Sequence, residues 1–115
     1  MKLPHLAPLI FAKDVLSLED KKAKVLCEFS DLPSLSMFIE AAAQASAAFE
    51  NTEKIGFVTK VKNVELLNKI CGNRYIIEIN MEVEIGNIIQ FFFIARDEEH
   101  NIETASGTIT LLIQG

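Results

Sequence analysis

The sequence has little positive charge. Eleven lysines and arginines stand against sixteen aspartates and glutamates, which gives a net charge of −5 at pH 7 and a pI near 5.0. The densest basic stretch is KKAK at residues 21–24, which is typical of a solvated turn or strand end. The charge balance therefore argues against nucleic acid or an anionic membrane as the main partner.

Cysteine and histidine are scarce, with two of each. Cys27 and Cys71 do not have the spacing of a metal site, so we expect two buried free thiols in a reducing compartment. His5 and His100 lie in distant segments, and one histidine per segment does not make a metal centre. The sequence also has no Gly-rich phosphate loop, so it predicts neither a metal nor a cofactor.

Long apolar runs are absent as well. The first segment, MKLPHLAPLIF, is interrupted by Pro4 and Pro8 and does not resemble a signal peptide. No segment approaches the roughly 20 consecutive apolar residues of a membrane span. We therefore expect no membrane insertion and a cytoplasmic location.

The chain nevertheless has the composition of a folded protein. Hydrophobic residues make up 50% of its 115 residues and charged residues 23%, and no repeat or linker interrupts them. We therefore predict a single domain, residues 1–115. Its first elements are two short strands, 13–18 and 23–29, joined by a turn at 19–22.

The segment DLPSLSMFIEAAAQASAAF, residues 31–49, predicts a helix. Pro33 together with Ser34 or Ser36 forms a start signal, and six of the eight residues from 41 to 48 are alanine, the best helix former. The polar residues after Phe49 predict an end near Glu50. Apolar residues surround nearly the whole circumference, which indicates a long, buried, central helix.

The remaining residues predict long antiparallel strands, at 56–66, 74–85, 88–96 and 102–113. Segment 74–85 alternates strictly, which predicts one buried face. That face consists of Tyr75, Ile77, Ile79, Met81, Val83 and Ile85. Gly86-Asn87 predicts a hairpin turn and DEEHN, 97–101, a second turn. The predicted class is α+β, with one long central apolar helix wrapped by a curved antiparallel sheet.

A polar stripe interrupts this helix. Ser36, Glu40 and Gln44 are spaced by four residues, so they share one helix face. One interpretation is a narrow solvated stripe. The other is a functional site, with Glu40 facing a substrate tunnel or a subunit seam and Gln44 anchoring it.

Three segments, in this order, resemble the 3-hydroxyacyl-[acyl-carrier-protein] dehydratases of the hotdog fold. LPHLAPLIFAKDV, residues 3–15, is similar to their N-terminal Leu-Pro-His-x-x-Pro segment. IEAAAQ, residues 39–44, matches their active-site helix, and residues 56–95 resemble the strands that follow. The resemblance covers nearly the whole chain and implies a hotdog fold, a dimer and acyl-thioester substrates, carried by acyl carrier protein or coenzyme A.

The resemblance also implies roles for single residues. Glu40 falls on the position of the family's catalytic carboxylate, Gln44 on that of its helix glutamine, and Ser36 extends the same stripe. Phe57 and Val58, after Gly56, would line the acyl path. The family's catalytic histidine precedes its helix, but no histidine occurs here between Val25 and Glu40. His5 matches the N-terminal family histidine, which is not the catalytic one.

Three functions remain open at this point. The first is a dehydratase-like protein with an incomplete site, as a homodimer by default or as a heterodimer with a histidine-bearing hotdog subunit. The second is a hotdog thioesterase that uses Glu40 as base or nucleophile and needs no histidine. The third is a non-catalytic module that binds an acyl chain or an acyl carrier protein.

Overall fold

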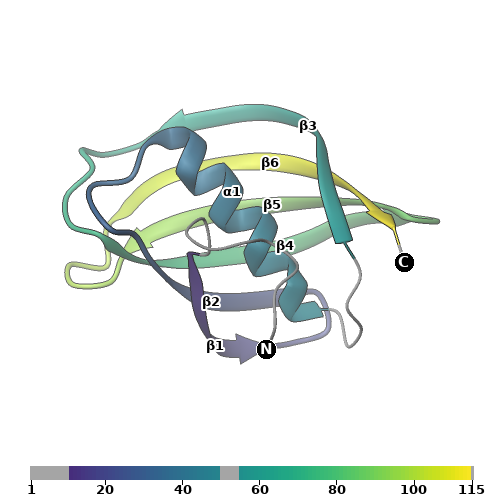
Figure 1. Ribbon diagram of the computed structural model, residues 1–115, viewed down its shortest axis with the longest axis horizontal. Coiled ribbons are helices and arrows are strands. Elements are labelled where there is room, and N and C mark those ends of the chain that lie inside the picture. Colours follow the sequence, from purple (N-terminus) through teal and green to yellow (C-terminus); the bar gives the residue numbers. More distant parts are fainter. Residues whose placement is uncertain (1–10, 50–54, 115) are drawn as a thin grey trace.

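The computed structural model describes residues 11–49 and 55–114. One helix lies across a curved antiparallel sheet (Figure 1), which confirms the α+β class. The elements in chain order are β1 (Ala12–Leu18), β2 (Lys22–Glu28), α1 (Leu35–Ala45), the 3₁₀ turn η1 (Ser46–Phe49), β3 (Ile55–Leu66), β4 (Arg74–Ile85), β5 (Ile88–Asp97) and β6 (Glu103–Gln114). The strand order in the sheet is β1-β2-β4-β5-β6-β3, so α1 carries the chain from one side of the sheet to the other.

The helix begins where the sequence predicts and ends earlier. Ser34 is the N-cap, and its Oγ accepts a hydrogen bond from Met37 N–H at 3.2 Å. The α-helix has only 11 residues and gives way to four residues of 3₁₀ helix, so the expected long helix is wrong. The reason lies at Ser46, whose hydroxyl donates to the carbonyl of Ala43 at 2.6 Å and competes with the regular helical pattern.

The helix buries one face and not its whole circumference. Phe38, Ala41, Ala42 and Ala45 are buried at helical spacing. Ile39 and Ala43, on the other side, are half-buried, and Ser36 is exposed. The sheet therefore covers α1 from one side, and the expectation of burial all round is wrong.

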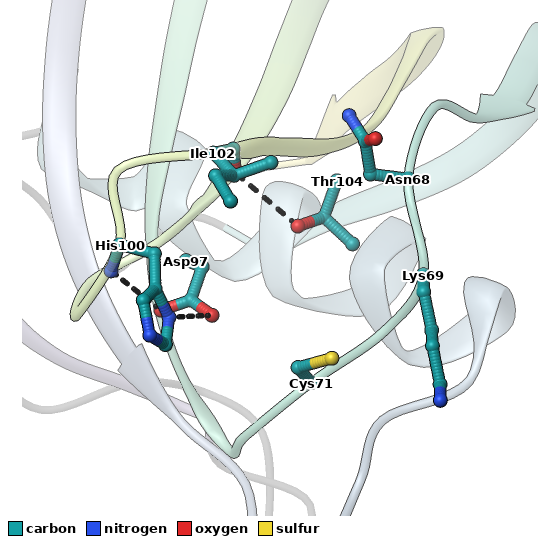
Figure 2. A pocket seen from close by; sticks show the side chains of 7 residues that line it. All are labelled: Asn68, Lys69, Cys71, Asp97, His100, Ile102 and Thr104. Carbon is teal, nitrogen blue, oxygen red and sulfur yellow. Dashed lines mark hydrogen bonds and ion pairs between the residues drawn. The ribbon is translucent and has the colours of Figure 1, made fainter.

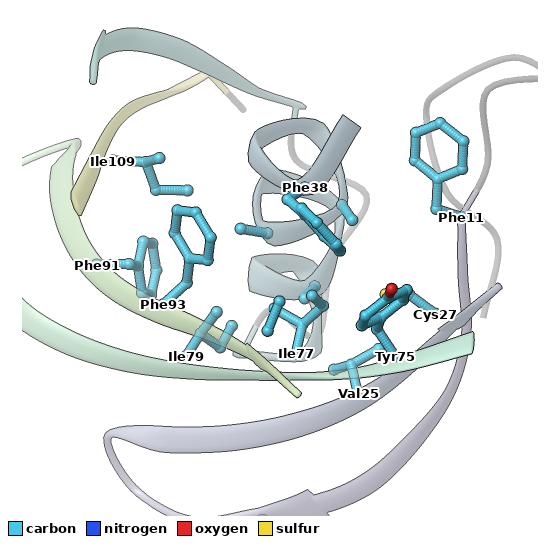
Figure 3. Packing of buried hydrophobic residues seen from close by; sticks show 14 of the residues in the cluster. Phe11, Val25, Cys27, Phe38, Tyr75, Ile77, Ile79, Phe91, Phe93 and Ile109 are labelled. Carbon is cyan, nitrogen blue, oxygen red and sulfur yellow. The ribbon is translucent and has the colours of Figure 1, made fainter. Parts of the chain in front are cut away.

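The core fills the space between α1 and the concave face of the sheet (Figure 3). Phe38 and Tyr75 meet edge to face, with ring centroids 4.8 Å apart. Ile77, Ile79 and Phe93 point toward the helix from β4 and β5. Small alanines on α1 allow these large side chains to approach the helix backbone closely.

A β-bulge breaks the alternation of β4. Tyr75, Ile77 and Ile79 are fully buried as predicted, but Val83 and Ile85 are exposed. The pairing of β4 with β5 shifts between Met81 and Val83, and one extra residue moves every later side chain to the opposite face. The predicted single buried face therefore ends at Met81.

A second bulge lies in β3, between Val58 and Lys60 in its pairing with β6. In the described residues β3 pairs on one side only, with β6, so it forms an edge of the sheet. The side chains from Phe57 to Asn63 are all exposed, on both faces of the strand. An edge of this length with exposed apolar residues is a surface on which another strand can pair.

Candidate functional site

The polar stripe of α1 contains a connected pair. Gln44 is buried, with 1% of its surface exposed, and its Nε2 donates to Glu40 Oε1 at 3.5 Å. Its Oε1 accepts hydrogen bonds from the backbone N–H of Phe11 at 2.7 Å and of Ala12 at 3.2 Å. The buried amide thus holds the start of β1 against the helix and touches the Glu40 carboxylate with its other end.

Glu40 itself is half-buried, one turn before Gln44 on α1. Its carboxylate is therefore partly accessible to solvent and is hydrogen-bonded to the buried side chain of Gln44. Its chemistry is that of a general acid or base, because a carboxyl group can take or give one proton to a bound molecule.

The other predicted site residues lie apart from this pair. Ser36 is exposed, one turn toward the N-terminus of α1. Val58 pairs with Leu111, a core residue, whereas Phe57 pairs with Leu112. Because paired residues share a face of the sheet, Val58 lies on the α1 side and Phe57 on the opposite side, so the two do not line one path within a single chain.

Within residues 11–49 and 55–114, no histidine belongs to the helix that carries the polar stripe. His5 lies outside them. His100 belongs to the turn between β5 and β6, and its Nδ1 lies 3.3 Å from Asp97 Oδ2. Its side chain is 56% exposed.

A cavity of about 280 Å³ lies beside that turn (Figure 2). Its lining comes from the segment after β3 and from the β5–β6 turn, and consists of Asn68, Lys69, Cys71, Asp97, His100, Ile102 and Thr104. Glu40 and Gln44 are not part of it. Sequence reasoning missed this cavity, since its two walls come from segments about 30 residues apart and only His100 in the DEEHN turn pointed to one of them.

The Asp97 side chain stabilises the β5–β6 turn through hydrogen bonds to its backbone. The nearly buried carboxylate accepts the backbone N–H groups of Glu99 at 2.8 Å and His100 at 3.2 Å. Burial by itself raises the pKa of Asp97, but the hydrogen bonds from His100 and Glu99 outweigh it and hold the pKa below its ordinary value. Asp97 is therefore a structural carboxylate that stays ionised.

The two cysteines differ in their exposure to solvent. Cys27 is buried in the core as predicted, and burial raises the pKa of its thiol to about 12. Cys71 is exposed at the cavity, so the expectation that both thiols are buried is wrong for Cys71. The tyrosine hydroxyl of Tyr75 donates to the Cys71 carbonyl at 2.8 Å and fixes the backbone that carries the exposed thiol.

Two structural features bear on partners. Among residues 11–49 and 55–114, no group of three or more His, Cys, Asp or Glu side chains is placed to hold a metal ion. Within the same residues, no helix combines the length and apolar character that crossing a membrane requires.

Neither a protein-family model nor a curated protein sequence matches the chain. Solved structures do. The dehydratase heterocomplex ApeI:P from Xenorhabdus doucetiae matches with a TM-score of 0.82 at 14% identity, over 98% of this chain and 88% of that one. The putative thioesterase yhdA from Lactococcus lactis matches with a TM-score of 0.70 at 15% identity, over 95% and 96%.

A third structure, smu.793 from Streptococcus mutans UA159 bound to acetyl CoA, matches with a TM-score of 0.69 at 16% identity, over 96% of this chain and 97% of that one. Matches of this extent at such low identity show the fold. The chain has the hotdog fold, with α1 across the concave face of a six-stranded antiparallel sheet.

Proposed function

We propose that this chain binds or acts on acyl thioesters as a dehydratase-like hotdog protein, with residues 1–115 as one domain. The observation that carries the proposal is the half-buried Glu40 carboxylate, held by buried Gln44 on the helix that crosses the sheet. The similar structures described as a dehydratase heterocomplex, a thioesterase and an acetyl-CoA complex support this class of ligand.

Dehydration of a 3-hydroxyacyl thioester needs two proton transfers. A base removes a proton from the carbon next to the thioester carbonyl, and an acid protonates the hydroxyl that leaves as water. Glu40 supplies one of these groups, as the acid. The sequence has no histidine from residue 6 to residue 99. We propose that a histidine-bearing second subunit supplies the second group in a heterodimer, whereas a homodimer would need another group as the base.

The β3 edge is the place where a second subunit adds to this chain. Its side chains from Phe57 to Asn63 are exposed on both faces, and in the described residues the strand is paired only with β6. A strand that paired at this edge would lie beside Val58 on the α1 face of the sheet and beside Phe57 on the opposite face. We propose a homodimer by default, or a heterodimer with a histidine-bearing hotdog subunit.

A second candidate function is thioester hydrolysis. The pair Glu40–Gln44 favours it, because a single carboxylate can act as base or nucleophile in hydrolysis without a histidine. In that case the chain would be active without a second kind of subunit. A third candidate is a non-catalytic subunit that binds an acyl chain or its carrier.

Turnover by the purified chain separates these functions. The protein is incubated with 3-hydroxyacyl and enoyl thioesters, and both the hydration–dehydration reaction and the release of free thiol are followed. Glu40→Gln is compared with Glu19→Gln, which makes the same change in the β1–β2 turn. Dehydration by wild type and Glu19→Gln but not by Glu40→Gln supports the dehydratase. Thiol release by wild type and Glu19→Gln but not by Glu40→Gln supports the thioesterase.

One result would count against a catalytic Glu40. Activity that Glu40→Gln retains would exclude Glu40 as the acid, base or nucleophile. Inactivity in both assays leaves the partner-dependent and binding functions, which are then tested by adding a histidine-bearing hotdog subunit and by measuring acyl-thioester binding. A chain that neither binds nor turns over acyl thioesters in any of these assays contradicts the proposed function.

A further inference from the structure

The β4 bulge after Met81 and the β3 bulge between Val58 and Lys60 turn Ile85 and Phe57 to the face of the sheet opposite α1. Phe57 pairs with Leu112, Leu112 with Ile88, and Ile88 with Ile85. We call these four residues the outer row. It crosses β3, β6, β5 and β4 side by side, and since neighbouring strands lie about 4.8 Å apart, it is roughly 15 Å long.

The outer row is open to solvent. Ile85 is 72% exposed, Ile88 49% and Phe57 48%, while Leu112 is half-buried between them. An outer sheet face that stays in water normally carries polar side chains. Contiguous apolar residues on such a face mark a contact surface, since single exposed apolar residues are common but connected rows are not.

The next row of side chains has opposite charges at its two ends. Lys60 pairs with Thr110, Thr110 with Gln90, and Gln90 with Val83. Glu82, the extra residue of the β4 bulge, joins this row through the hydrogen bond from Gln90 Nε2 to its Oε1 at 3.1 Å. The positive end of the row thus lies on β3 and the negative end on β4.

This arrangement is complementary to itself. A two-fold axis that runs along the strands, between β5 and β6, reverses the strand order of a second copy. Such a copy places its Glu82 opposite Lys60 and its Ile85 opposite Phe57, and the reverse contacts follow by symmetry. Two sheets packed face to face lie about 10 Å apart, a gap that the exposed side chains of Lys60 and Glu82 can bridge.

We propose that the outer row is a self-association surface on which a second copy of this chain packs face to face. The contact is distinct from strand pairing at the β3 edge and does not depend on the proposed function. Where the β3 edge also pairs, the outer row joins two such pairs. In either case, loss of this contact halves the mass of the largest assembly.

The first test measures assembly mass by sedimentation velocity over a range of concentrations. Ile85→Glu buries a charge in the contact and is expected to halve the mass of the largest species. Leu32→Glu, which also replaces an exposed apolar side chain by glutamate, at a 58% exposed leucine in the loop before α1, is the control and is expected to leave the mass unchanged. A wild-type chain without any assembly, or an Ile85→Glu variant that assembles like wild type, overturns the proposal.

The second test examines the two-fold arrangement by charge reversal. Lys60→Glu and Glu82→Lys each place like charges opposite one another twice per contact, and each is expected to weaken assembly about tenfold at low salt. The double variant restores opposite charges and is expected to assemble like wild type. A double variant that is as weak as the single variants overturns the face-to-face contact, because folding defects would add and would not cancel.

Discussion

Gln44 Oε1 accepts the backbone N–H of Phe11 at 2.7 Å, which ties the last turn of α1 to the start of β1 across 33 residues of sequence. The same oxygen accepts the N–H of Ala12 at 3.2 Å. Gln44 thereby satisfies two backbone donors at the start of β1, where Ala12 is the first residue that pairs with β2. The polar side chain of Gln44 on the apolar helix α1 is thus a structural link as well as a neighbour of Glu40.

Gln44→Leu keeps the approximate size of the side chain but removes the acceptor. The buried N–H of Phe11 then lacks a hydrogen bond, so we expect the free energy of unfolding to fall by about 1–3 kcal/mol. Chemical denaturation followed by circular dichroism measures this loss. Ser36→Ala, at an exposed position of the same stripe, is the control and is expected to change stability by less than about 0.5 kcal/mol; equal losses in the two variants would argue against the link.

The turn at Asp97 predicts a dependence of stability on pH. Since the pKa of Asp97 in the folded state lies below its unfolded value, the ionised carboxylate stabilises the fold above about pH 4, and this contribution is lost as the pH falls through the folded-state pKa. Asp97→Asn removes the titrating group. We expect the variant to be less stable than wild type at pH 7 and the difference to narrow at pH 3.

Denaturation at several pH values measures this difference. Glu99→Gln changes an exposed carboxylate in the same turn and serves as the control, with a small difference from wild type at every pH. A gap between wild type and Asp97→Asn that stays constant from pH 7 to pH 3 would show that the Asp97 carboxylate does not contribute through its charge.

Much of the sheet could be predicted because its signals are local. The alternation in residues 74–81 and the Gly86-Asn87 turn depend on neighbouring residues, and the structure places β4 and the β4–β5 turn where they predict. The helix start at Ser34 is also a local signal. These features follow from the side-chain period and from backbone preferences, which a single sequence contains.

The features that were missed depend on residues far apart in the sequence. The bulge after Met81 arises from how β4 pairs with β5, and a regular alternation of residues gives no sign of it. The backbone donors that Gln44 binds lie more than 30 residues away. Cys71 likewise is exposed and lines a cavity together with residues of the β5–β6 turn, which lie about 30 residues away in the sequence.

The two thiols should react very differently. Cys27 is fully buried and its pKa is raised to about 12, whereas Cys71 is exposed. Because the thiolate is the reactive form, we expect an aromatic disulfide reagent at pH 7.5 to modify one thiol per folded chain at once and the second only after unfolding. Cys71→Ser should abolish the fast phase and Cys27→Ser should keep it; a fast phase in Cys71→Ser would place Cys27 within reach of solvent.

Gly107 on β6 has no room for a side chain. A Cβ atom there would lie 2.7 Å from Val64 Cγ2 and 3.0 Å from Phe93 Cε2. Val64 follows Asn63, which has a positive φ of 56°, and the pairing of β3 with β6 shifts between Lys62 and Glu65. The bulged segment of β3 therefore lies directly against Gly107, and we expect Gly107→Ala to lower the free energy of unfolding by about 1–3 kcal/mol.

A double-mutant cycle tests whether this close approach is the cause. Val64→Ala removes the nearest methyl group, although Val64 Cα remains 3.2 Å from the new Cβ. We therefore expect the double variant Gly107→Ala/Val64→Ala to lose less stability than the sum of the single variants, measured by denaturation with Ser106→Ala as the neighbouring control. Strictly additive losses would mean that Val64 does not limit the space, and that the cost of a side chain at residue 107 arises against Phe93 or in the strand backbone itself.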